Sequence, residues 1–377
     1  MPAFDLVVLG SGGGPYETNL SAYLLKTHSA SWEDGMIALD AGSGLGALDR
    51  LLDRHPDLFG PVHKCDPPRG ALDIYSFVRC FLITHAHLDH VNGLVLSAGS
   101  LKPLDRHRRI HGFRSVLKNL DLLFSGRVWP KLATWDPTDE PYKLLLDPLT
   151  FDNTFKVVHP DVSVMTMPIS HGLKETTSSS KEASCAYESS VFFIRQISSG
   201  HEFLFFGDVE PDSVALKKQT RAVWRAAAHK IPDVLSAVFI ECSWPSGRKD
   251  AELYGHLSPE HLSAELTVLA SEVASVRRGG GGTPVAKGSN GHTRKKRRPN
   301  PVEASVDELR GALRGLRVYV MHCKNDMGEL ITEQVKALVE AKGLGAEVLR
   351  VDQGTHICEL SSLQASTVSV RGADLRY

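Results

Sequence analysis

Four side chains that can bind a metal ion lie close together in the sequence, directly after an apolar stretch. They are His85, His87, Asp89 and His90, in the run 84–90. In extended backbone, side chains two residues apart point to the same side, so His85 and His87 can bind one ion. Asp89 and His90 follow at the predicted start of a helix, where they can bind a second ion. Imidazole and carboxylate groups suit zinc or another borderline divalent metal, so this spacing favours a metal site over a polar surface turn.

One loop cannot fill the coordination shells of two ions, so further ligands must follow other strands. Three residues meet this condition. His171 follows a predicted strand at 162–167, Asp208 follows the apolar run 203–206, and His322 follows the apolar run 317–321. Taken singly, such a residue is more often part of a turn or a cap, and only the combination indicates a metal site.

The elements that must position these residues alternate between strands and helices, which predicts the α/β class. The strands are predicted at 6–9, 36–39, 77–84, 162–167, 191–194, 203–206, 237–240, 317–321, 347–351 and 356–360, and the helices at 45–52, 91–98, 211–228, 259–275 and 327–341. Ionisable residues recur just after strand ends, where open α/β sheets place their sites. The run Gly10–Gly14 predicts a tight turn beside the site, because the residues after it do not start the helix that a nucleotide-binding loop needs.

In its motifs the chain resembles the metallo-β-lactamase superfamily and, within it, the class II cyclic-nucleotide phosphodiesterases. The matching blocks are 10–15, 39–42, 85–98, 170–172, 189–194, 206–212, 240–243, 255–259 and 320–324. The His-x-His-x-Asp-His block alone indicates only the superfamily. Its extension through Ser97-Ala98 and the block Gly-Asp-Val-Glu-Pro-Asp at 207–212 are more specific. The resemblance extends from Gly10 to about Gln353.

The resemblance implies an αββα sandwich, in which two mixed β-sheets are flanked by helices. It also implies two divalent metal ions, expected to be zinc. His85, His87 and His171 would bind the first ion, Asp89, His90 and His322 the second, and Asp208 would bridge them. Asp40 has two interpretations that the sequence leaves open: it orients a ligand histidine, or it caps the helix predicted from Leu45.

The reaction implied by the resemblance is hydrolysis of a 3′,5′-cyclic nucleotide to a 5′-mononucleotide, with cAMP favoured and cGMP the other substrate. Two adjacent cations would activate water and neutralise the phosphoryl oxygens during an in-line displacement. Asp89 and Asp208 would take part in catalysis by binding these two ions. His256 would give a proton to the ribose 3′ oxygen as it leaves; the alternative for His256 is a cap of the helix predicted from Pro259.

The composition of the chain limits the kinds of molecule that it is expected to bind. The 377 residues have a net charge of -1, a hydrophobic fraction of 42% and a charged fraction of 23%, which is ordinary for a globular protein. With a pI of about 7.0, the chain has no general attraction for nucleic acid or membrane, so the expected partner is a small-molecule substrate. A tRNA 3′-processing nuclease or a thioester hydrolase is the alternative within the superfamily. A non-catalytic protein on the same scaffold is disfavoured, because all seven ligands are present.

The expected organisation is one domain over 1–377 with a flexible, basic insert at about 277–303. This segment contains four consecutive glycines and the basic run 294–298, which indicates a solvated linker or a nuclear-localisation signal. The chain start does not read as a secretory signal, and the six cysteines form no C-x-x-C pair. We therefore expect a cytoplasmic protein, with a nuclear fraction directed by the insert, and a homodimer.

Overall fold

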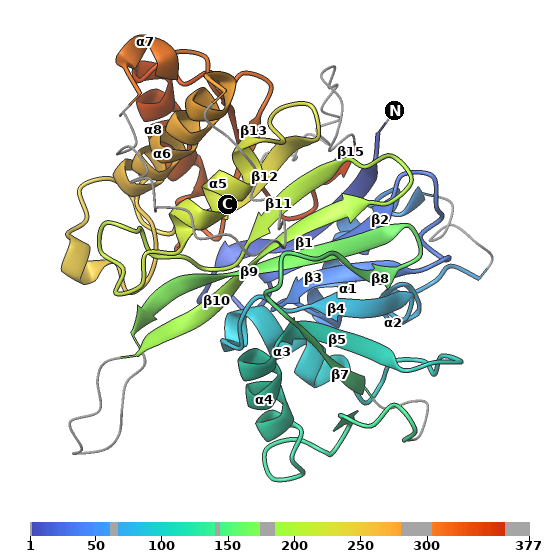
Figure 1. Ribbon diagram of the computed structural model, residues 1–377. Helices are drawn as coiled ribbons and strands as arrows, with labels where there is room; N and C mark the ends of the chain where they lie inside the picture. Colours follow the sequence, from blue (N-terminus) through green and yellow to red (C-terminus); the bar gives the residue numbers. More distant parts are fainter. Residues whose placement is uncertain (1, 61–66, 140–143, 174–184, 280–303, 359–377) are drawn as a thin grey trace, which may run out of the picture.

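The computed structural model describes residues 2–60, 67–139, 144–173, 185–279 and 304–358. Two β-sheets lie face to face at the centre, and helices cover the outer face of each (Figure 1). Three groups of buried apolar side chains correspond to these layers: one lies between the sheets, and one lies under each set of helices. The predicted αββα sandwich is therefore confirmed.

The first sheet has eight strands in the order β15-β1-β2-β3-β4-β5-β7-β6. Their bounds are β1 Phe4–Gly13, β2 Leu20–Thr27, β3 Met36–Ala41, β4 Val78–Leu82, β5 Arg108–Phe113, β6 Ala133–Thr134, β7 Leu144–Leu149 and β15 His356–Cys358. The strands β3, β4 and β5 run parallel. The outer face packs against α1 Leu45–Arg54, α2 Ala71–Tyr75, α3 Leu88–Ser97 and α4 Arg114–Leu123.

The second sheet has seven strands in the order β14-β13-β12-β11-β10-β9-β8. Their bounds are β8 Lys156–His159, β9 Val162–Leu173, β10 Ala186–Gln196, β11 Glu202–Phe206, β12 Leu235–Glu241, β13 Arg317–Met321 and β14 Glu347–Arg350. The strands β11 to β14 run parallel. The outer face packs against α5 Thr220–Ala228, α6 Pro259–Arg277, α7 Val306–Leu309 and α8 Gly328–Ala341, and η2 Asp250–Glu252 is a single 3-10 turn.

Aromatic side chains fill much of the space between the two sheets. Tyr23 of the first sheet meets Phe205 of the second edge to face, with ring centroids 5.2 Å apart. Within the second sheet, Phe239 stacks on Tyr319 at 4.5 Å. Both faces of the central strands are buried, which explains why these strands read as continuous apolar runs in the sequence. The packed interior fixes the relative position of the two sheets and hence of the loops at their edges.

One predicted helix is wrong at its start. The sequence predicts a helix over 211–228, but α5 begins at Thr220, and residues 211–219 form turns. The physical reason is the side chain of Asp212, which accepts hydrogen bonds from the backbone N–H groups of Thr220 and Arg221. A carboxylate at a helix start satisfies amides that have no partner within the helix, so Asp212 is placed before the helix.

The turn predicted at Gly10–Gly14 is also wrong, because β1 continues through Gly13. Small residues are needed there for a different reason, which is the close approach of the chain that carries His322. A Cβ atom on Gly13 would lie 2.6 Å from Nδ1 of His322. The backbone N–H of His322 donates to the carbonyl of Ser11. The glycines therefore allow β1 to pack against the segment that follows β13.

Most of the predicted insert at 277–303, including the basic run 294–298, lies outside the described residues; α6 ends at Arg277. The single-domain organisation stays a prediction. In the described parts, no helix combines the length and the apolar composition needed to cross a membrane.

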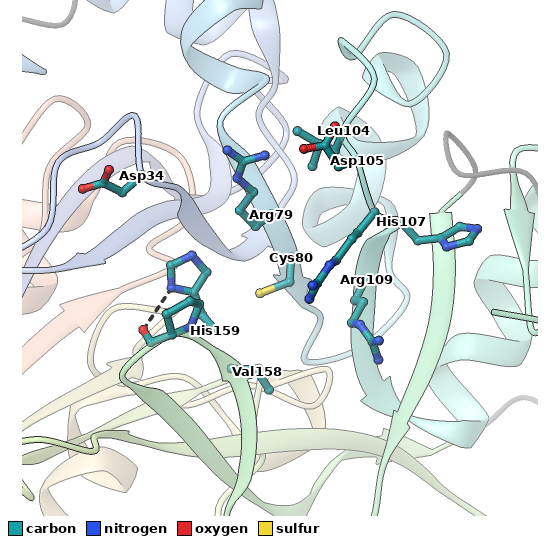
Figure 2. A pocket seen from close by; sticks show the side chains of 11 residues that line it. Asp34, Arg79, Cys80, Leu104, Asp105, His107, Arg109, Val158 and His159 are labelled. Carbon is teal, nitrogen blue, oxygen red and sulfur yellow. Dashed lines mark hydrogen bonds between the residues drawn. The ribbon is translucent and has the colours of Figure 1, made fainter. Parts of the chain in front are cut away.

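At the amino ends of β4 and β5 the surface is hollowed into a cavity of about 370 Å³ (Figure 2).

Candidate metal centre

The residues predicted to bind metal all lie at one edge of the two sheets. His85 follows β4, Asp208 follows β11 and His322 follows β13, each within a few residues of the strand's carboxyl end. His171 lies near the end of β9, which runs in the same direction as β11 because each is antiparallel to β10. Since parallel strands end at the same edge, these side chains converge although they are far apart in sequence.

The first group of metal-binding atoms comes from His85, His87, His171 and Asp208. Nδ1 of His87 lies 3.1 Å from Nε2 of His85 and 3.2 Å from Nε2 of His171. The Oδ2 atom of Asp208 lies 3.7 Å from Nε2 of His85 and 3.6 Å from Nε2 of His171. Four donor atoms thus surround one point.

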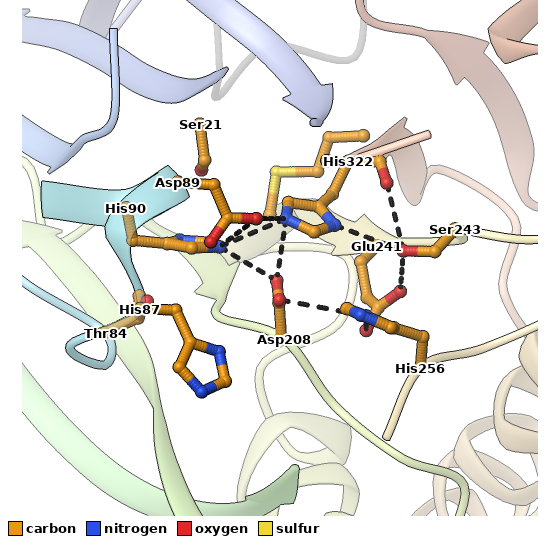
Figure 3. A network of polar contacts seen from close by, with 12 residues as sticks. Ser21, Thr84, His87, Asp89, His90, Asp208, Glu241, Ser243, His256 and His322 are labelled. Atoms are coloured by element: carbon orange, nitrogen blue, oxygen red, sulfur yellow. Dashed lines mark hydrogen bonds and ion pairs between the residues drawn. The ribbon is translucent and has the colours of Figure 1, made fainter. Parts of the chain in front are cut away.

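The second group comes from Asp89, His90, His322 and the same Asp208, shown at the centre of Figure 3. Nε2 of His90 and Nε2 of His322 lie 3.1 Å apart. The Oδ1 atom of Asp208 is 3.3 Å from the first and 3.4 Å from the second. Asp89 completes the group, 3.4 Å from His322. The two oxygens of Asp208 therefore face different groups, as a bridging carboxylate would.

These distances fit divalent metal ions. Zinc bonds of about 2.0–2.1 Å to nitrogen in a tetrahedral site place neighbouring donor atoms about 3.3 Å apart. The separations of 3.1–3.2 Å between ring nitrogens match this spacing. In the first group, three imidazole nitrogens point at a common centre, and a hydrogen bond between two rings would not explain the third. Imidazole and carboxylate donors also suit divalent cations chemically.

The ring nitrogens that point away from the centre are held by other groups. Nδ1 of His90 lies 2.7 Å from the Asp40 carboxylate, and Nδ1 of His171 lies 2.7 Å from the carbonyl oxygen of Gly255. Similarly, His85 lies 3.1 Å from the hydroxyl of Thr84, and His322 lies 3.1 Å from that of Ser243. Such partners fix the tautomer and orientation of a ligand histidine.

Asp40 therefore lies where the orienting interpretation places it, and the capping interpretation is wrong. The cap of α1 is Gly44, with no side-chain hydrogen bond. Besides contacting His90, the Asp40 carboxylate accepts hydrogen bonds from the backbone N–H and the hydroxyl of Thr84. Asp40 thus connects the residue before His85 to His90, so it fixes the positions of the two groups of ligands relative to each other.

The protonation states favour cation binding in the first group. Burial lowers the pKa of His171 to about 4 and holds the pKa of His85 well below its ordinary value. Loss of water around the ring of His87, whose side chain is only partly covered by its neighbours, also lowers its pKa. A neutral imidazole keeps the lone pair that a metal needs, so these three rings are ready to bind at neutral pH.

The shared carboxylate and His90 of the second group affect each other's pKa. Burial alone would raise the pKa of Asp208, but the electrostatic effect of the neighbouring His322 and His90 outweighs it and holds that pKa well below the ordinary range. Burial likewise opposes the charged form of His90, yet Asp208 and Asp40 raise its pKa well above the ordinary value. The site thus contains buried carboxylates that need nearby positive charge.

The centre opens to solvent at His87 and Asp89. His87 is exposed and Asp89 is half-buried, whereas His85, His90, His171, Asp208 and His322 are all buried. Tyr187 of β10 stacks on the exposed His87 ring with centroids 4.5 Å apart and an interplanar angle of 26°. A substrate would therefore approach from the side of His87 and Asp89, beside Tyr187.

Beside the shared carboxylate lies a buried Glu–His pair, of which the sequence predicts a role only for His256. Nδ1 of His256 lies 2.9 Å from Oε1 of Glu241, and 3.7 Å from Oδ2 of Asp208 (Figure 3). Burial opposes the charged form of His256, but the Glu241 carboxylate outweighs it and raises the His256 pKa. His256 is not the cap of α6, because Ser258 occupies that position.

Glu241 also reaches both groups of ligands. Its Oε1 atom accepts a hydrogen bond from the backbone N–H of Val209, next to Asp208. Its Oε2 atom accepts one from the hydroxyl of Ser243, which in turn contacts His322. A fully buried carboxylate with this many partners is stabilised in its charged form.

Two residues of the centre adopt left-handed backbone conformations that only glycine adopts without strain. The φ angles are 50° at Asp40 and 59° at His322. Close packing accompanies them: a Cβ atom on Gly42 would lie 1.8 Å from the carbonyl oxygen of Asp89. Strain of this kind costs about 1–3 kcal/mol per residue, so the surrounding contacts must hold these two residues in place.

The structure brings together all seven predicted ligands as well as His256 and Asp40. That the seven residues bind metal ions stays a prediction. The sequence alone indicates no role for Glu241, Ser243, Thr84 or Tyr187. Glu241 could have been found, since it ends a buried strand next to the strands that precede Asp208 and His322. Tyr187 carries no comparable signal, because nothing in the local sequence indicates which ring it contacts.

Comparison with known proteins gives consistent results. The 3′,5′-cyclic-nucleotide phosphodiesterase of Schizosaccharomyces pombe is 33% identical over 294 residues, which cover 72% of this chain and 77% of that protein. The enzyme of the same name from Aliivibrio fischeri is 28% identical over 366 residues, covering 93% of this chain and 92% of the relative.

Solved structures agree on the fold. The crystal structure of unliganded yeast PDE1 matches with a TM-score of 0.73 at 22% identity, covering 95% of this chain and all of the other. A metallo-β-lactamase fold protein of Bacillus subtilis, YhfI, matches with a TM-score of 0.51 at 14% identity, again over 95% of this chain.

Residues 62–354 match the family described as class-II cAMP phosphodiesterases. The chain therefore has the metallo-β-lactamase fold and belongs to the class-II cAMP phosphodiesterase family.

Proposed function

We propose that this protein hydrolyses 3′,5′-cyclic nucleotides to 5′-mononucleotides, with cAMP as the preferred substrate and cGMP as the second. The observation that carries the proposal is the pair of donor groups that share Asp208 in a chain of this family. A cyclic phosphodiester is an anion, and a site with two adjacent cations attracts it and neutralises its charge. Hydrolysis would control the level of the cyclic nucleotide in signalling.

Two zinc ions are the proposed cofactor. His85, His87 and His171 would hold the first, Asp89, His90 and His322 the second, and Asp208 both. This assignment is supported by donor atoms spaced as tetrahedral zinc requires. When bound, such a pair supplies a nucleophile at neutral pH and Lewis acidity toward the phosphoryl oxygens.

The protein's own residues would position the substrate and move one proton. The exposed side of the centre, at His87 and Asp89, would receive the phosphate. Nδ1 of His256 is occupied by Glu241, so Nε2 is the atom that would give a proton to the ribose 3′ oxygen as the bond to phosphorus breaks. Glu241 would act as a positioning residue, because it holds His256 in its charged form.

A steady-state assay tests the proposed function. We expect the metal-loaded protein to turn over cAMP and cGMP, with 5′-AMP and 5′-GMP as products identified by chromatography. EDTA is expected to abolish turnover and added zinc to restore it. Formation of the 3′-monophosphate, or undiminished turnover by protein shown to be free of metal, would contradict the proposal.

The same assay separates the alternatives within the superfamily. A tRNA 3′-processing nuclease would cleave a precursor tRNA, and a thioester hydrolase would cleave a thioester, in preference to a cyclic nucleotide. Near-neutral charge argues against the nuclease, because a substrate of that kind requires a basic binding surface. Family membership supports the cyclic nucleotide.

The second prediction concerns the Glu–His pair. We expect Glu241→Gln to lower kcat for cAMP about 10²-fold with a small change in KM, because the amide cannot hold His256 charged. His256→Ala is expected to lower kcat at least as much. A charged His256 donates its proton below its pKa, so activity should be lost as pH rises through that pKa. In Glu241→Gln this loss should move to lower pH.

The matched control is Glu340→Gln, which changes an exposed glutamate in the last turn of α8. It should leave both kcat and the pH profile unchanged. If Glu241→Gln lowers kcat but leaves the basic limb of the pH profile where it was, then the role of Glu241 is structural and the proton-transfer assignment is wrong.

A homodimer in solution and a cytoplasmic location with a nuclear fraction are further proposals. They are supported by the family resemblance and by the basic run 294–298, respectively. Light scattering of the purified protein tests the first, and the distribution of a fluorescent fusion with and without the basic run tests the second.

A further inference from the structure

The cavity at the amino ends of β4 and β5 is distinct from the metal centre. It lies between Arg79 and Cys80 of β4, the segment 104–109 that leads into β5, and His159 of β8 (Figure 2). Its volume of about 370 Å³ falls within the range of small-molecule sites, which is roughly 300–1,000 Å³. Since Val158 belongs to the second sheet, both sheets contribute to the lining.

Three arginines line the cavity, and two of them have no carboxylate partner. Arg109 pairs with Asp147 at 2.6 Å. For Arg79 and Arg106, no carboxylate of the described residues comes within ion-pair distance. A guanidinium has five N–H donors and stays charged at any physiological pH, so half-buried Arg79 and exposed Arg106, which line one cavity, can both donate to an anion.

The absence of a side chain at Gly35 leaves room for the Arg79 side chain at the cavity wall. Gly35, with φ of 131°, packs under its side chain, and a Cβ atom on Gly35 would lie 2.5 Å from Cγ of Arg79 and 2.9 Å from Nε2 of His159. The glycine therefore makes room for both side chains at the cavity wall. Arg79 is half-buried, which makes its charge more effective than that of a fully exposed residue.

The acidic residues near the cavity do not neutralise these two arginines. The Asp147 carboxylate is shared between Arg109 and Lys156, at 2.6 Å and 2.5 Å. Asp34 accepts a hydrogen bond from the backbone N–H of Ser31 in an exposed turn. Asp105 is exposed at the rim. Asp34 and Asp105 line the cavity without pairing with Arg79 or Arg106, so the guanidinium donors of these two arginines remain available to a ligand.

From this arrangement we infer that the cavity is a second ligand site, which binds a small organic phosphomonoester through Arg79 and Arg106. Arginine pairs bidentately with phosphate oxygens, which favours this group over a monovalent anion. The cavity is larger than a phosphate ion needs, and Leu104, Val158 and Pro160 supply apolar walls for the organic part of the ligand. The inference does not depend on the proposed catalytic function.

The site is too far from the metal centre to be part of it. Arg79 and His85 are six residues apart on and just beyond β4, which at about 3.3 Å per residue corresponds to about 20 Å. This exceeds the Debye length of about 8 Å at physiological ionic strength, so charges at one site act weakly at the other. A ligand in the cavity would leave the metal centre open to substrate.

Calorimetric titration of the metal-loaded, full-length protein with glucose 6-phosphate tests the inference. We expect binding by the wild type, at least tenfold weaker binding by the double variant Arg79→Gln/Arg106→Gln, and no binding of glucose itself. The matched control is Arg127→Gln, an exposed arginine outside the cavity, which should bind as the wild type does.

Two further measurements separate this site from the metal centre and from misfolding. The inhibition constant of glucose 6-phosphate against cAMP turnover reports on the metal centre and should be equal in all variants. Arg79→Lys/Arg106→Lys keeps the charge and should lose only part of the affinity, with an unchanged unfolding midpoint. Equal binding by the wild type and the glutamine double variant, or loss of the binding in Asp208→Asn, which disrupts only the metal centre, would overturn the inference.

Discussion

Replacement of His87 by alanine is expected to lower kcat/KM for cAMP by a factor on the order of 10³ or more, while the protein stays folded. His87 contributes a ring nitrogen to the first donor group, 3.1 Å from His85 and 3.2 Å from His171. Because its side chain is exposed, its removal leaves no cavity in the core. The loss of activity would therefore not result from unfolding.

Metal analysis of His87→Ala gives the sharper readout. With one ligand of the first group removed, the metal content is expected to fall from two ions per chain toward one, because the second group remains intact. The matched control is His201→Ala, which changes a histidine in the turn between β10 and β11. If His87→Ala keeps two ions and full activity, then His87 is not a ligand.

Replacement of Asp208 by asparagine is expected to have a larger effect, with loss of both ions and activity reduced to the background of the assay. The two carboxylate oxygens of Asp208 face different donor groups, at 3.6–3.7 Å in the first and 3.3–3.4 Å in the second. Asparagine has nearly the same shape but no negative charge, and its amide nitrogen cannot bind a cation. The centre would then keep its histidines but not its bridge.

The free energy of unfolding should increase with the number of metal ions bound. An ion that binds only the folded protein stabilises it by about 2.7 kcal/mol at a free concentration 100 times its dissociation constant. We therefore expect added zinc to raise the unfolding midpoint of the wild type and of the control Asp152→Asn, but not that of Asp208→Asn. Retention of a full metal complement by Asp208→Asn would refute the bridging assignment, whatever the activity.

These two substitutions together distinguish one shared centre from two independent sites. If the groups were independent, removal of His87 and removal of Asp208 would each cost one ion. A shared carboxylate predicts that the costs differ, with one ion lost in the first variant and two in the second. The difference is measurable by elemental analysis without any assumption about the substrate.

The sequence by itself determined the fold class and predicted which side chains form the candidate metal centre. The spacing of His85, His87, Asp89 and His90 after a buried strand is local, and so local physics is sufficient to predict a metal site there. His171, Asp208 and His322 could be found because each follows an apolar strand. Parallel strands bring such ends to one edge whatever their separation in sequence.

Only the tertiary structure decided how these residues are held. The Asp40–His90 and Glu241–His256 pairs join residues that are 50 and 15 positions apart, and no local pattern fixes which carboxylate meets which ring. The start of α5 was mispredicted for the same reason, since Asp212 meets amides eight and nine residues away. The cavity between Arg79 and His159 likewise exists only where two sheets meet, because packing between sheets depends on side chains that are not neighbours in sequence.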